Sequence, residues 1–365
     1  MFPESHNHLR SGCLAALCAN AVSRRSVLGA IASLGVSFAL PAMSLQAAQR
    51  RRAERPMSLV TLFMQGGMSQ LETFDPHPGS PAGGQTTAIR TTVPEIQISS
   101  LLPRTAEQMH SALLIRSLTS REGDHERGVS YAKTGYRPEQ TLKYPSIGAI
   151  AARELPDPAV EIPQHVSLAA DRWFAVGGYL GNQWDAFRVF DPGNSLANLK
   201  ANVEDGRQAA RLRSLAEADD EFQKRHRFGA PKTLHRKTVD DAVRMMSSEQ
   251  LNALILDDES DAVRKAYGDS RFGRGCLVAR RLVETGVRSI EVTLNGFDTH
   301  ADNYDGHVTQ CNVLDPALAT LIQELRERDL LESTIVLCIS EFGRTPRINP
   351  AGGRDHWPHW FSGLV

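Results

Sequence analysis

The run Ser58-Leu-Val-Thr-Leu-Phe-Met64, followed by Gln65-Gly66-Gly67, is the strongest fold signal in the sequence. Its first seven residues are largely apolar and rich in strand formers, and the paired glycines suit a tight turn. Ser69 then stands at a helix N-cap position, with Glu72 three residues further on. A strand, a glycine turn and a helix start together predict the opening of an α/β domain.

Further apolar runs and helical patterns extend this prediction along the chain. Continuous apolar runs are typical of strands in a parallel sheet that is covered on both faces. Two helical patterns, 272–286 and 307–329, each lead into such a run. This alternation predicts a doubly wound, mostly parallel sheet with helices on both faces. The apolar runs are 112–118, 288–294 and 334–339, and the other helical patterns are 202–226, 240–256 and 261–267.

The composition is that of a globular protein without a strong charge. The chain has 365 residues, of which 41% are hydrophobic, and a formal net charge of -1. We therefore expect a single α/β domain over residues 56–365, with a helical insertion at about 200–265. A near-neutral charge balance gives no reason to expect nucleic acid or an anionic membrane as partner.

The cysteines do not suggest a structural framework. Cys13 and Cys18 lie near the N-terminus, which leaves Cys276, Cys311 and Cys338 in the rest of the chain. That number is odd, and no two of these residues are spaced as CxxC. The sequence therefore argues against a disulfide framework and against a cysteine-rich zinc site.

Residues 1–48 have the pattern of a twin-arginine signal peptide. Arg24 and Arg25 precede an apolar stretch from Val27 to Leu45, and small residues follow at Ala47 and Ala48. The stretch is short and glycine-rich for a membrane span, although an uncleaved N-terminal anchor is the alternative. This interpretation predicts a periplasmic or secreted protein that is carried by the twin-arginine export machinery and has no stable membrane span after cleavage.

Acidic and histidine side chains follow the predicted strands. In open α/β sheets, ligands bind beyond the carboxyl ends of the strands. Acids occur after all four predicted strands and histidines after three of them, so these loops are where we expect the chemistry. The residues of this set are Asp75, His125, Asp298, His300, Glu341, Asp355 and His356.

The spacing of these residues predicts a divalent metal site. Asp298 and His300 are two apart, so in an extended segment both side chains point the same way and can ligate one cation. Asp355 and His356 are adjacent, so they point to opposite sides and can serve two ions, or one ion and a substrate. Carboxylates and imidazoles suit zinc, manganese or a similar divalent ion. The expected cofactor is therefore a divalent metal, with zinc, manganese, calcium and magnesium all left open. Glu341 and Asp75 are weaker ligand candidates.

Other residues in these loops are candidates for binding an anionic ester or for catalysis. Arg344 and Arg354 have guanidinium groups that can bind ester oxygens bidentately, and we assign Arg344 a catalytic role. The Gly66-Gly67 turn can hold an anion through backbone N–H groups at a helix N-terminus. His125 is a further candidate for substrate binding, and Ser69 is the best candidate for a nucleophile.

Each of these assignments has a structural alternative. The two glycines can form only a tight turn, and Ser69 can serve only as an N-cap. Glu341 and Arg344 can form a structural ion pair, and His125 can be an ordinary surface residue. The pairs Asp298 with His300 and Asp355 with His356 are therefore the firmest part of the predicted site.

The residues of these loops also carry a family resemblance. The stretch Gly66-Gly67-Met68-Ser69-Gln70-Leu71-Glu72-Thr73-Phe74-Asp75-Pro76 resembles the opening motif of the uncharacterised family DUF1501. Later motifs resemble its further landmarks in the right order, and the match runs from about Pro56. They are Asp124-His125, Thr134-Gly135-Tyr136, Gly178-Tyr179-Leu180-Gly181, Phe297-Asp298-Thr299-His300, Glu341-Phe342-Gly343-Arg344-Thr345-Pro346 and Gly353-Arg354-Asp355-His356-Trp357-Pro358.

That family is similar to the alkaline phosphatase and sulfatase superfamily. The resemblance implies a doubly wound α/β fold with a divalent metal site at the strand ends. Asp355-His356 resembles the adjacent Asp-His pair that ligates two metals in that superfamily. The sulfatase nucleophile motif is absent after the first strand. Family members usually continue for a further strand and helix, so a chain that ends at Val365 is expected to be C-terminally truncated.

These observations predict an exported metal-dependent hydrolase of sulfate or phosphate esters. The alternative is a non-catalytic protein on the same fold that binds an anionic glycan or assembles on the cell surface, and the missing nucleophile motif favours it. A phosphosugar isomerase or mutase is a third interpretation, but export argues against it because such substrates are cytoplasmic. A nucleophile within reach of the metal residues distinguishes the first two.

Overall fold

A computed structural model describes residues 57–365, except 171, 195, 197, 198, 200 and 227–233. The described residues all belong to one compact unit, Pro56–Val365. The predicted signal peptide at 1–48 lies outside the described residues. Among the residues that are described, no helix combines the length and the apolar character needed to cross a membrane.

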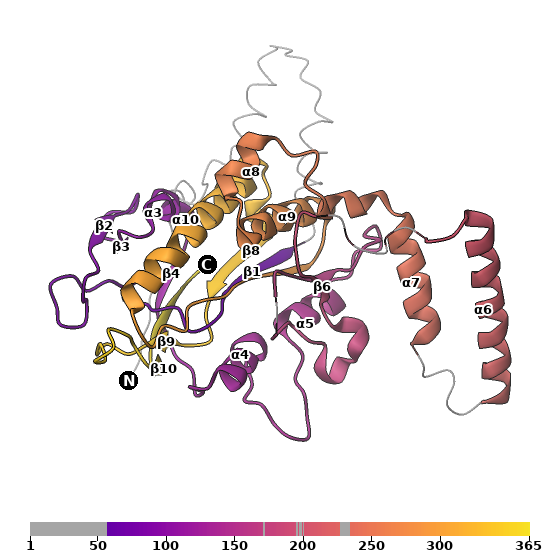
Figure 1. Ribbon diagram of the computed structural model, residues 1–365, viewed down its shortest axis with the longest axis horizontal. Coiled ribbons are helices and arrows are strands. Elements are labelled where there is room, and N and C mark those ends of the chain that lie inside the picture. Colours follow the sequence, from indigo (N-terminus) through magenta and orange to yellow (C-terminus); the bar gives the residue numbers. More distant parts are fainter. Residues whose placement is uncertain (1–56, 171, 195, 197–198, 200, 227–233) are drawn as a thin grey trace, which may run out of the picture. The chain divides into compact units, whose positions relative to one another are not determined.

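The core of this unit is a mostly parallel sheet of seven strands (Figure 1). β1 lies at its centre and pairs in parallel with β7 on one side and β8 on the other. β5 and β6 continue the parallel part beyond β7, whereas β11 runs antiparallel to both β8 and β4. In sheet order the strands are β4 (Leu114–Leu118), β11 (Phe361–Leu364), β8 (Thr334–Ile339), β1 (Ser58–Met64), β7 (Ser289–Leu294), β5 (His165–Leu168) and β6 (Phe187–Val189).

Helices cover both faces of this sheet, as β7 shows. A Cβ atom on Gly275 of α9 (Arg271–Thr285) would lie 2.7 Å from Val292, and one on Gly148 of α5 (Ile147–Glu154) would lie 2.3 Å from the hydroxyl of Ser289. Residues 289 and 292 point to opposite faces, because side chains alternate along a strand. Figure 1 shows α9 with α10 on one side and α5 with α4 on the other. The α/β fold with a doubly wound, mostly parallel sheet is therefore confirmed.

The helices also follow the expected order. α9 and α10 lead into β7 and β8, as the two helical patterns predicted, and β1, β7 and β8 lie where apolar runs were found. The helices are α3 (Pro103–Gln108), α4 (His125–Thr134), α5 (Ile147–Glu154), α6 (Asp205–Arg225), α7 (His235–Ser247), α8 (Asp261–Tyr267), α9 (Arg271–Thr285) and α10 (Asn303–Glu327).

Three expectations about single elements were wrong. No helix begins at Ser69, because the residues after β1 form successive turns, and the next helix is α3. The strand at 114–118 is not covered on both faces, since it is the half-exposed edge strand β4. The predicted helix 240–256 ends at Ser247, and the side chain of Ser248 caps a separate 3-10 helix, Glu249–Leu254.

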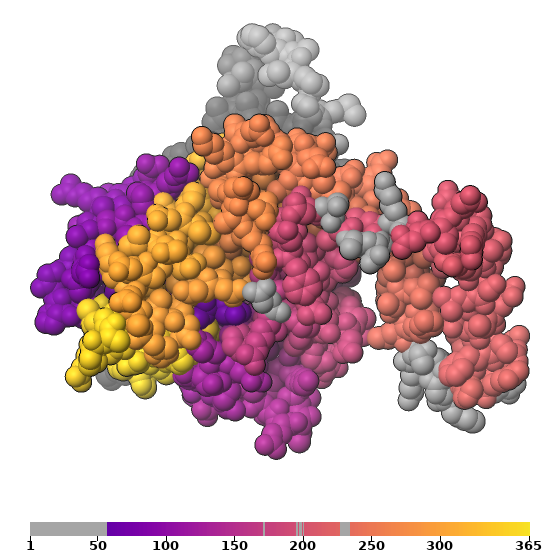
Figure 2. All heavy atoms as spheres, in the orientation of Figure 1, coloured from indigo at the N-terminus to yellow at the C-terminus, as the bar shows by residue number. Residues whose placement is uncertain are grey.

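Three strands and two small ribbons were not predicted. β5, β6 and β11 have three or four residues each, too few for a hydrophobic period to stand out. The ribbons join β2 (Ala88–Arg90) to β3 (Gln97–Ser99) and β9 (Gly343–Arg344) to β10 (His356–Trp357). In Figure 2 the yellow C-terminal residues lie near the indigo residues that follow β1, so distant parts of the sequence meet at this side of the sheet.

Candidate metal centre

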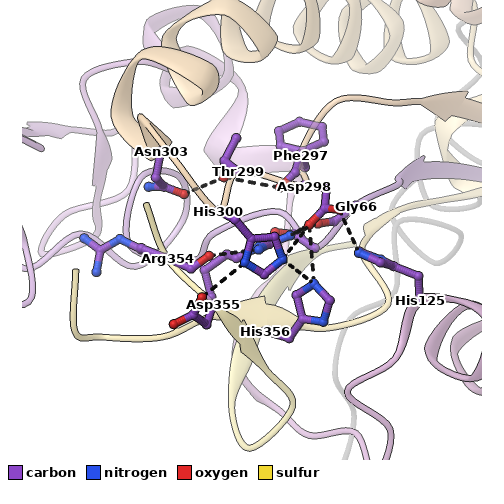
Figure 3. A network of polar contacts seen from close by, with 12 residues as sticks. Gly66, His125, Phe297, Asp298, Thr299, His300, Asn303, Arg354, Asp355 and His356 are labelled. Carbon is purple, nitrogen blue, oxygen red and sulfur yellow. Dashed lines mark hydrogen bonds and ion pairs between the residues drawn. The ribbon is translucent and has the colours of Figure 1, made fainter. Parts of the chain in front are cut away.

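The loops that follow the central strands meet at one edge of the sheet. Because β1, β5, β7 and β8 are parallel, their carboxyl ends lie at the same edge. Asp298 follows β7, Glu341 follows β8, and His356 begins β10. His125 is the first residue of α4, whose N-cap is the side chain of Asp124. Figure 3 shows the side chains of His125, Asp298, His300 and His356 gathered in one cluster.

Three of these residues form a candidate metal site. His125, Asp298 and His356 each offer one ligand atom, and the three atoms lie within 4.8 Å of one another. His125 Nε2 is 3.2 Å from Asp298 Oδ2, and His356 Nε2 is 3.3 Å from Asp298 Oδ1. Two imidazoles and a carboxylate are a ligand set typical of zinc and similar divalent ions.

Glu341 fixes the orientation of His125. Its Oε1 atom is 2.9 Å from His125 Nδ1 and accepts a second hydrogen bond from the N–H of Gly66. A carboxylate accepts hydrogen bonds, so Nδ1 carries the proton and Nε2 presents its lone pair to the cluster. His125 Nε2 is buried and has no well-directed hydrogen-bond partner among the described residues. A metal-binding histidine is commonly held by a carboxylate in this way.

A backbone carbonyl orients His356 in the same manner. His356 Nδ1 donates to the carbonyl oxygen of Gly123 at 2.6 Å, which leaves the lone pair of Nε2 facing Asp298. Burial lowers the pKa of His356, so the ring is neutral and able to ligate a cation at neutral pH. The two ligand histidines therefore present the same nitrogen, and each is held at its other nitrogen by an oxygen acceptor.

His300 adds a further nitrogen to the cluster. Its Nδ1 atom is 3.1 Å from Asp355 Oδ1, and its Nε2 atom is 3.0 Å from His356 Nε2 and 3.1 Å from Asp298 Oδ1. Each ring has its Nδ1 atom against an oxygen acceptor, so the two Nε2 atoms face each other beside a carboxylate. Such a group of acceptors requires a proton or a cation, so the residues present fit a divalent metal.

Arg344 keeps Asp298 ionised. Burial alone would favour the protonated acid, but a 2.7 Å hydrogen bond from Arg344 and the nearby His125 lower the pKa of Asp298 to about 2. In contrast, the hydrogen bond to Glu341 raises the pKa of His125, so at mildly acidic pH a proton competes with a metal for this ring. The carboxylate is thus a permanent anion at the centre of the cluster.

Arg344 is a positioning residue and not an exposed anion binder. It has no exposed surface. Its guanidinium donates to the carbonyl oxygens of Gly66, Gly67 and Arg354 besides Asp298. Because these acceptors occupy the guanidinium within the protein, Arg344 cannot reach an ester in this conformation. The predicted catalytic contact is therefore not seen, although the residue does belong to the site.

The other predicted ligands are divided between the cluster and its surroundings. His300 lies in the cluster, on the same side as Asp298, as their spacing predicted. Asp355 points away from the three ligand atoms and accepts from His300. Glu341 is fully buried behind His125 and acts through it. Asp75 pairs with Arg116 at 3.1 Å and with His77, and among the described residues it forms no ion pair with the cluster, so its assignment as a ligand finds no support.

Backbone N–H groups in and beside the Gly66-Gly67 turn form hydrogen bonds within the protein. The N–H of Gly66 donates to Glu341 and that of Met68 donates to Ser340, so this loop does not present these groups to an anion. Gly66 has φ +114, and a Cβ atom there would lie 2.6 Å from the backbone nitrogen of Asp298. The glycine therefore allows the loops after β1 and β7 to approach, a structural role and not the predicted anion site.

Ser69 and Arg354 are also buried away from solvent. Ser69 has no exposed surface, and its N–H donates to His307 Nε2, so its hydroxyl is not available to an ester. Arg354 is equally buried and donates to Glu72 Oε1 and to the carbonyl oxygens of Ala82, Thr345 and Pro346. The nucleophile and substrate-binding predictions for these two residues do not agree with the structure.

The sequence had placed His125 with the substrate, whereas the structure places it among the candidate ligands. Its position at the start of a capped helix gave no signal of this, because the helix and the Asp298 loop meet only in the folded chain. Trp173 and Phe342, whose rings pack against the ring of His125, were not predicted either. No pattern in the sequence marks these two aromatic residues as neighbours of the site.

Three solved structures resemble this chain at low identity. The C-terminal periplasmic domain of EcEptC from Escherichia coli, in complex with Zn, is 9% identical with a TM-score of 0.38 over 85% of this chain and 72% of that one. Alkaline phosphatase from the Antarctic bacterium TAB5 is 14% identical with a TM-score of 0.35 over 85% and 91%. A mutant of that enzyme with Mg bound has the same identity and TM-score over 85% and 90%. These likenesses carry no conclusion about the activity of this chain.

No curated protein matches the sequence. A family does match it, over residues 56–365, which is most of the chain and all of the described part. Its description is "Protein of unknown function (DUF1501)". The match includes every element of the sheet and all of the residues in the candidate metal centre, so the chain belongs to the DUF1501 family.

Proposed function

We propose that this protein is an exported metal-dependent hydrolase of sulfate or phosphate esters. The observation that carries the proposal is the convergence of His125 Nε2, His356 Nε2 and a carboxylate oxygen of Asp298 at the carboxyl edge of the sheet. Both imidazoles are held so that lone pairs face the cluster. Clefts at this edge are the usual ligand sites of open α/β sheets.

Each residue of the site would have a distinct role in binding the metal or in holding its ligands. His125, Asp298 and His356 would hold the metal through two imidazole nitrogens and a carboxylate oxygen. A bound divalent ion would polarise an ester oxygen and make water acidic enough to attack at neutral pH. Glu341 keeps the Nδ1 proton on His125, and Arg344 keeps Asp298 anionic.

Water is the nucleophile that the geometry favours. Ser69 and Thr73 have no exposed surface, so neither hydroxyl can attack an ester that arrives from solvent. His300 is half-exposed, and Asp355 accepts a hydrogen bond from its Nδ1 atom. This pairing orients the ring so that Nε2 can accept or return a proton during hydrolysis.

The proposal is tested by metal analysis and hydrolysis assays on the purified chain. We expect a stoichiometric divalent metal after supplementation with zinc or manganese, and turnover of p-nitrophenyl phosphate or p-nitrophenyl sulfate. Asp298→Asn should lose both, whereas Asp261→Asn, which changes a fully exposed carboxylate on α8, should keep both. A folded wild-type chain that takes up no metal would remove the basis of the proposal.

A non-catalytic role on the same fold is the second candidate. The burial of Ser69 and Arg344 favours it, because neither the predicted nucleophile nor the predicted catalytic guanidinium is open to a ligand at the cluster. In that case the metal centre would bind an anionic glycan without cleaving it. A metal-loaded chain that binds sulfated glycans but hydrolyses neither ester would favour this candidate over the hydrolase.

We further propose that the protein leaves the cytoplasm by twin-arginine export. Arg24 and Arg25 carry this proposal, together with the apolar stretch that follows them. Replacing both with lysine in the full chain should retain the protein in the cytoplasm, whereas the same change at Arg50 and Arg51, beyond the predicted cleavage zone, should not. Normal export of the first variant would contradict this route.

A further inference from the structure

A group of arginines and aromatic rings lies next to the candidate metal centre. The loop after β5 carries Arg172, Trp173 and Phe174, and β6 carries Arg188, with Phe190 directly after it. β5 pairs in parallel with β7, so its loop leaves the same edge of the sheet as the loop that carries Asp298. We call these five residues the Arg-aromatic surface.

Trp173 joins this surface to the metal centre. Its ring stacks on the ring of His125 with centroids 6.3 Å apart and an interplanar angle of 19°. The guanidinium of Arg172 lies over the same Trp173 ring, 5.0 Å from its centroid. One side chain therefore contacts both a candidate metal ligand and an exposed arginine, which places a positive charge next to the site.

Arg188 is held in a similar way. Its guanidinium lies 4.4 Å from the ring centroid of Phe174 and 5.4 Å from that of Phe190. The N–H of Ala186 donates to the carbonyl oxygen of Ala175, which fixes the β5 loop beside the start of β6. The aromatic rings thus hold the arginine by their faces and leave its N–H groups for another partner.

Within the part of the chain that the structure describes, Arg172 and Arg188 have no carboxylate partner. Arg172 and Arg188 are exposed, and no carboxylate among the described residues forms an ion pair with either one. In contrast, Arg274 on α9 pairs with Asp191 and Asp269. These two guanidinium groups lie beside a site that is proposed to bind an anionic ester. Because neither has a carboxylate partner among the described residues, both are available to bind an anionic ligand.

We propose that the Arg-aromatic surface is a subsite for a second sulfate or phosphate group of a polyanionic glycan. Guanidinium groups match the oxygens of sulfate and phosphate, and they bind them bidentately. The ring of Phe190, which is 52% exposed, adds an apolar face on which a sugar ring can lie. The claim that this glycan is the substrate rests on the proposed function, but the binding of the anion does not.

The test is the binding of dextran sulfate to the metal-free full chain, measured by titration calorimetry beside uncharged dextran. We expect binding of dextran sulfate alone. The double change Arg172→Gln with Arg188→Gln should weaken it at least about tenfold, the size expected for loss of a charge-assisted hydrogen bond. Arg211→Gln with Arg213→Gln removes the same charge from exposed positions on α6 and should leave the affinity unchanged.

The outcomes separate this proposal from the proposed function. If Asp298→Asn abolishes metal binding but leaves dextran sulfate bound, the result supports the subsite independently of the proposed hydrolase function. A wild-type chain that does not bind dextran sulfate, or a double variant at 172 and 188 that binds it normally, would overturn the subsite. Equal weakening by the α6 control would also overturn it, because the binding would then follow net charge and not this surface.

Discussion

The candidate metal centre and a buried pair formed by Arg354 and Glu72 lie at the same edge of the sheet. They differ in whether their polar atoms have hydrogen-bond partners of the opposite kind. In the metal centre, the Nε2 atoms of His125, His300 and His356 all lie within 3.3 Å of a carboxylate oxygen of Asp298, so possible acceptor atoms gather around one carboxylate. In the buried brace formed by Arg354 and Glu72, one guanidinium donates to a carboxylate and to three backbone carbonyls. An excess of acceptors marks a place for a cation, whereas a satisfied guanidinium marks a structural link.

The sequence does not separate these two regions, because both contribute acids and bases to loops after predicted strands. The motif that contains Arg354 also contains His356, yet the first side chain enters the interior and the second enters the cluster. Partners and exposure, and not residue type, decide which role each residue has. The comparison therefore predicts that the two regions respond differently to mutation.

The largest effect is expected at the brace. Arg354→Met would leave Glu72 as a buried carboxylate without its cation, and breaking such a pair typically costs about 3–5 kcal/mol of unfolding free energy. Urea unfolding measures this loss. Glu72→Gln in the same chain should recover part of it, since the uncompensated charge is removed. A single variant as stable as the wild type would show that the brace is not a structural link.

The next effect is expected at a metal ligand. His356→Ala should lower zinc affinity by more than about 100-fold, because loss of an outer partner alone typically costs 10–100-fold. The metal-free variant should lose only about 0.5–1.5 kcal/mol of unfolding free energy relative to the metal-free wild type, because the hydrogen bond to Gly123 is also removed. Titration calorimetry and urea unfolding give the two values. Equal zinc affinity in both chains would mean that the cluster does not hold the metal.

A smaller effect on affinity is expected from Glu341, which orients His125 without being one of the three candidate ligands. Glu341→Gln should weaken zinc binding by about 10–100-fold, because the neutral amide holds the Nδ1 proton of His125 less firmly. Glu249→Gln changes an exposed acid far from β8 and serves as control. If Glu341→Gln weakens binding as much as His356→Ala does, Glu341 is a ligand after all, as the sequence predicted.

The smallest effect concerns the acid stability of the segment that orients His356. Hydrogen bonds from Arg127 and Arg137 lower the pKa of Glu122 to about 2, although burial opposes this. A lowered folded pKa contributes stability that is present above the unfolded value near 4.5 and is lost as pH falls toward 2. Glu122→Gln should therefore reduce stability at pH 7 and lessen its fall between pH 4.5 and 2, as measured by urea unfolding. An unchanged fall would contradict the assignment.

The sequence predicted the central fold because β1, β7 and β8 are apolar runs of six or seven residues with helices before two of them. It missed β5, β6 and β11, whose few residues pair only in the folded sheet. It also placed a helix after Gly67, since a capping pattern at Ser69 and Glu72 looks the same when the chain forms turns. Tertiary contacts override such local signals, here the buried hydrogen bonds from the turn to Glu341 and Ser340.

The candidate site was predicted in part. Asp298 and His300 follow β7, and His356 lies in the ribbon that follows β8, so both segments meet at the carboxyl edge that the alternation of elements anticipates. The roles of Ser69, Arg344 and Arg354 were not predictable, because burial depends on how distant loops pack. Residue types indicated correctly at which edge of the sheet the site lies, but only the packed loops show which side chains face solvent.

The central claim is that His125, Asp298 and His356 hold one divalent cation, and anomalous diffraction tests it most directly. Crystals of the protein grown with zinc should show an anomalous peak about 2.0–2.2 Å from His125 Nε2, His356 Nε2 and a carboxylate oxygen of Asp298. A peak bound only by other residues, or no peak in crystals that contain zinc, would contradict the account.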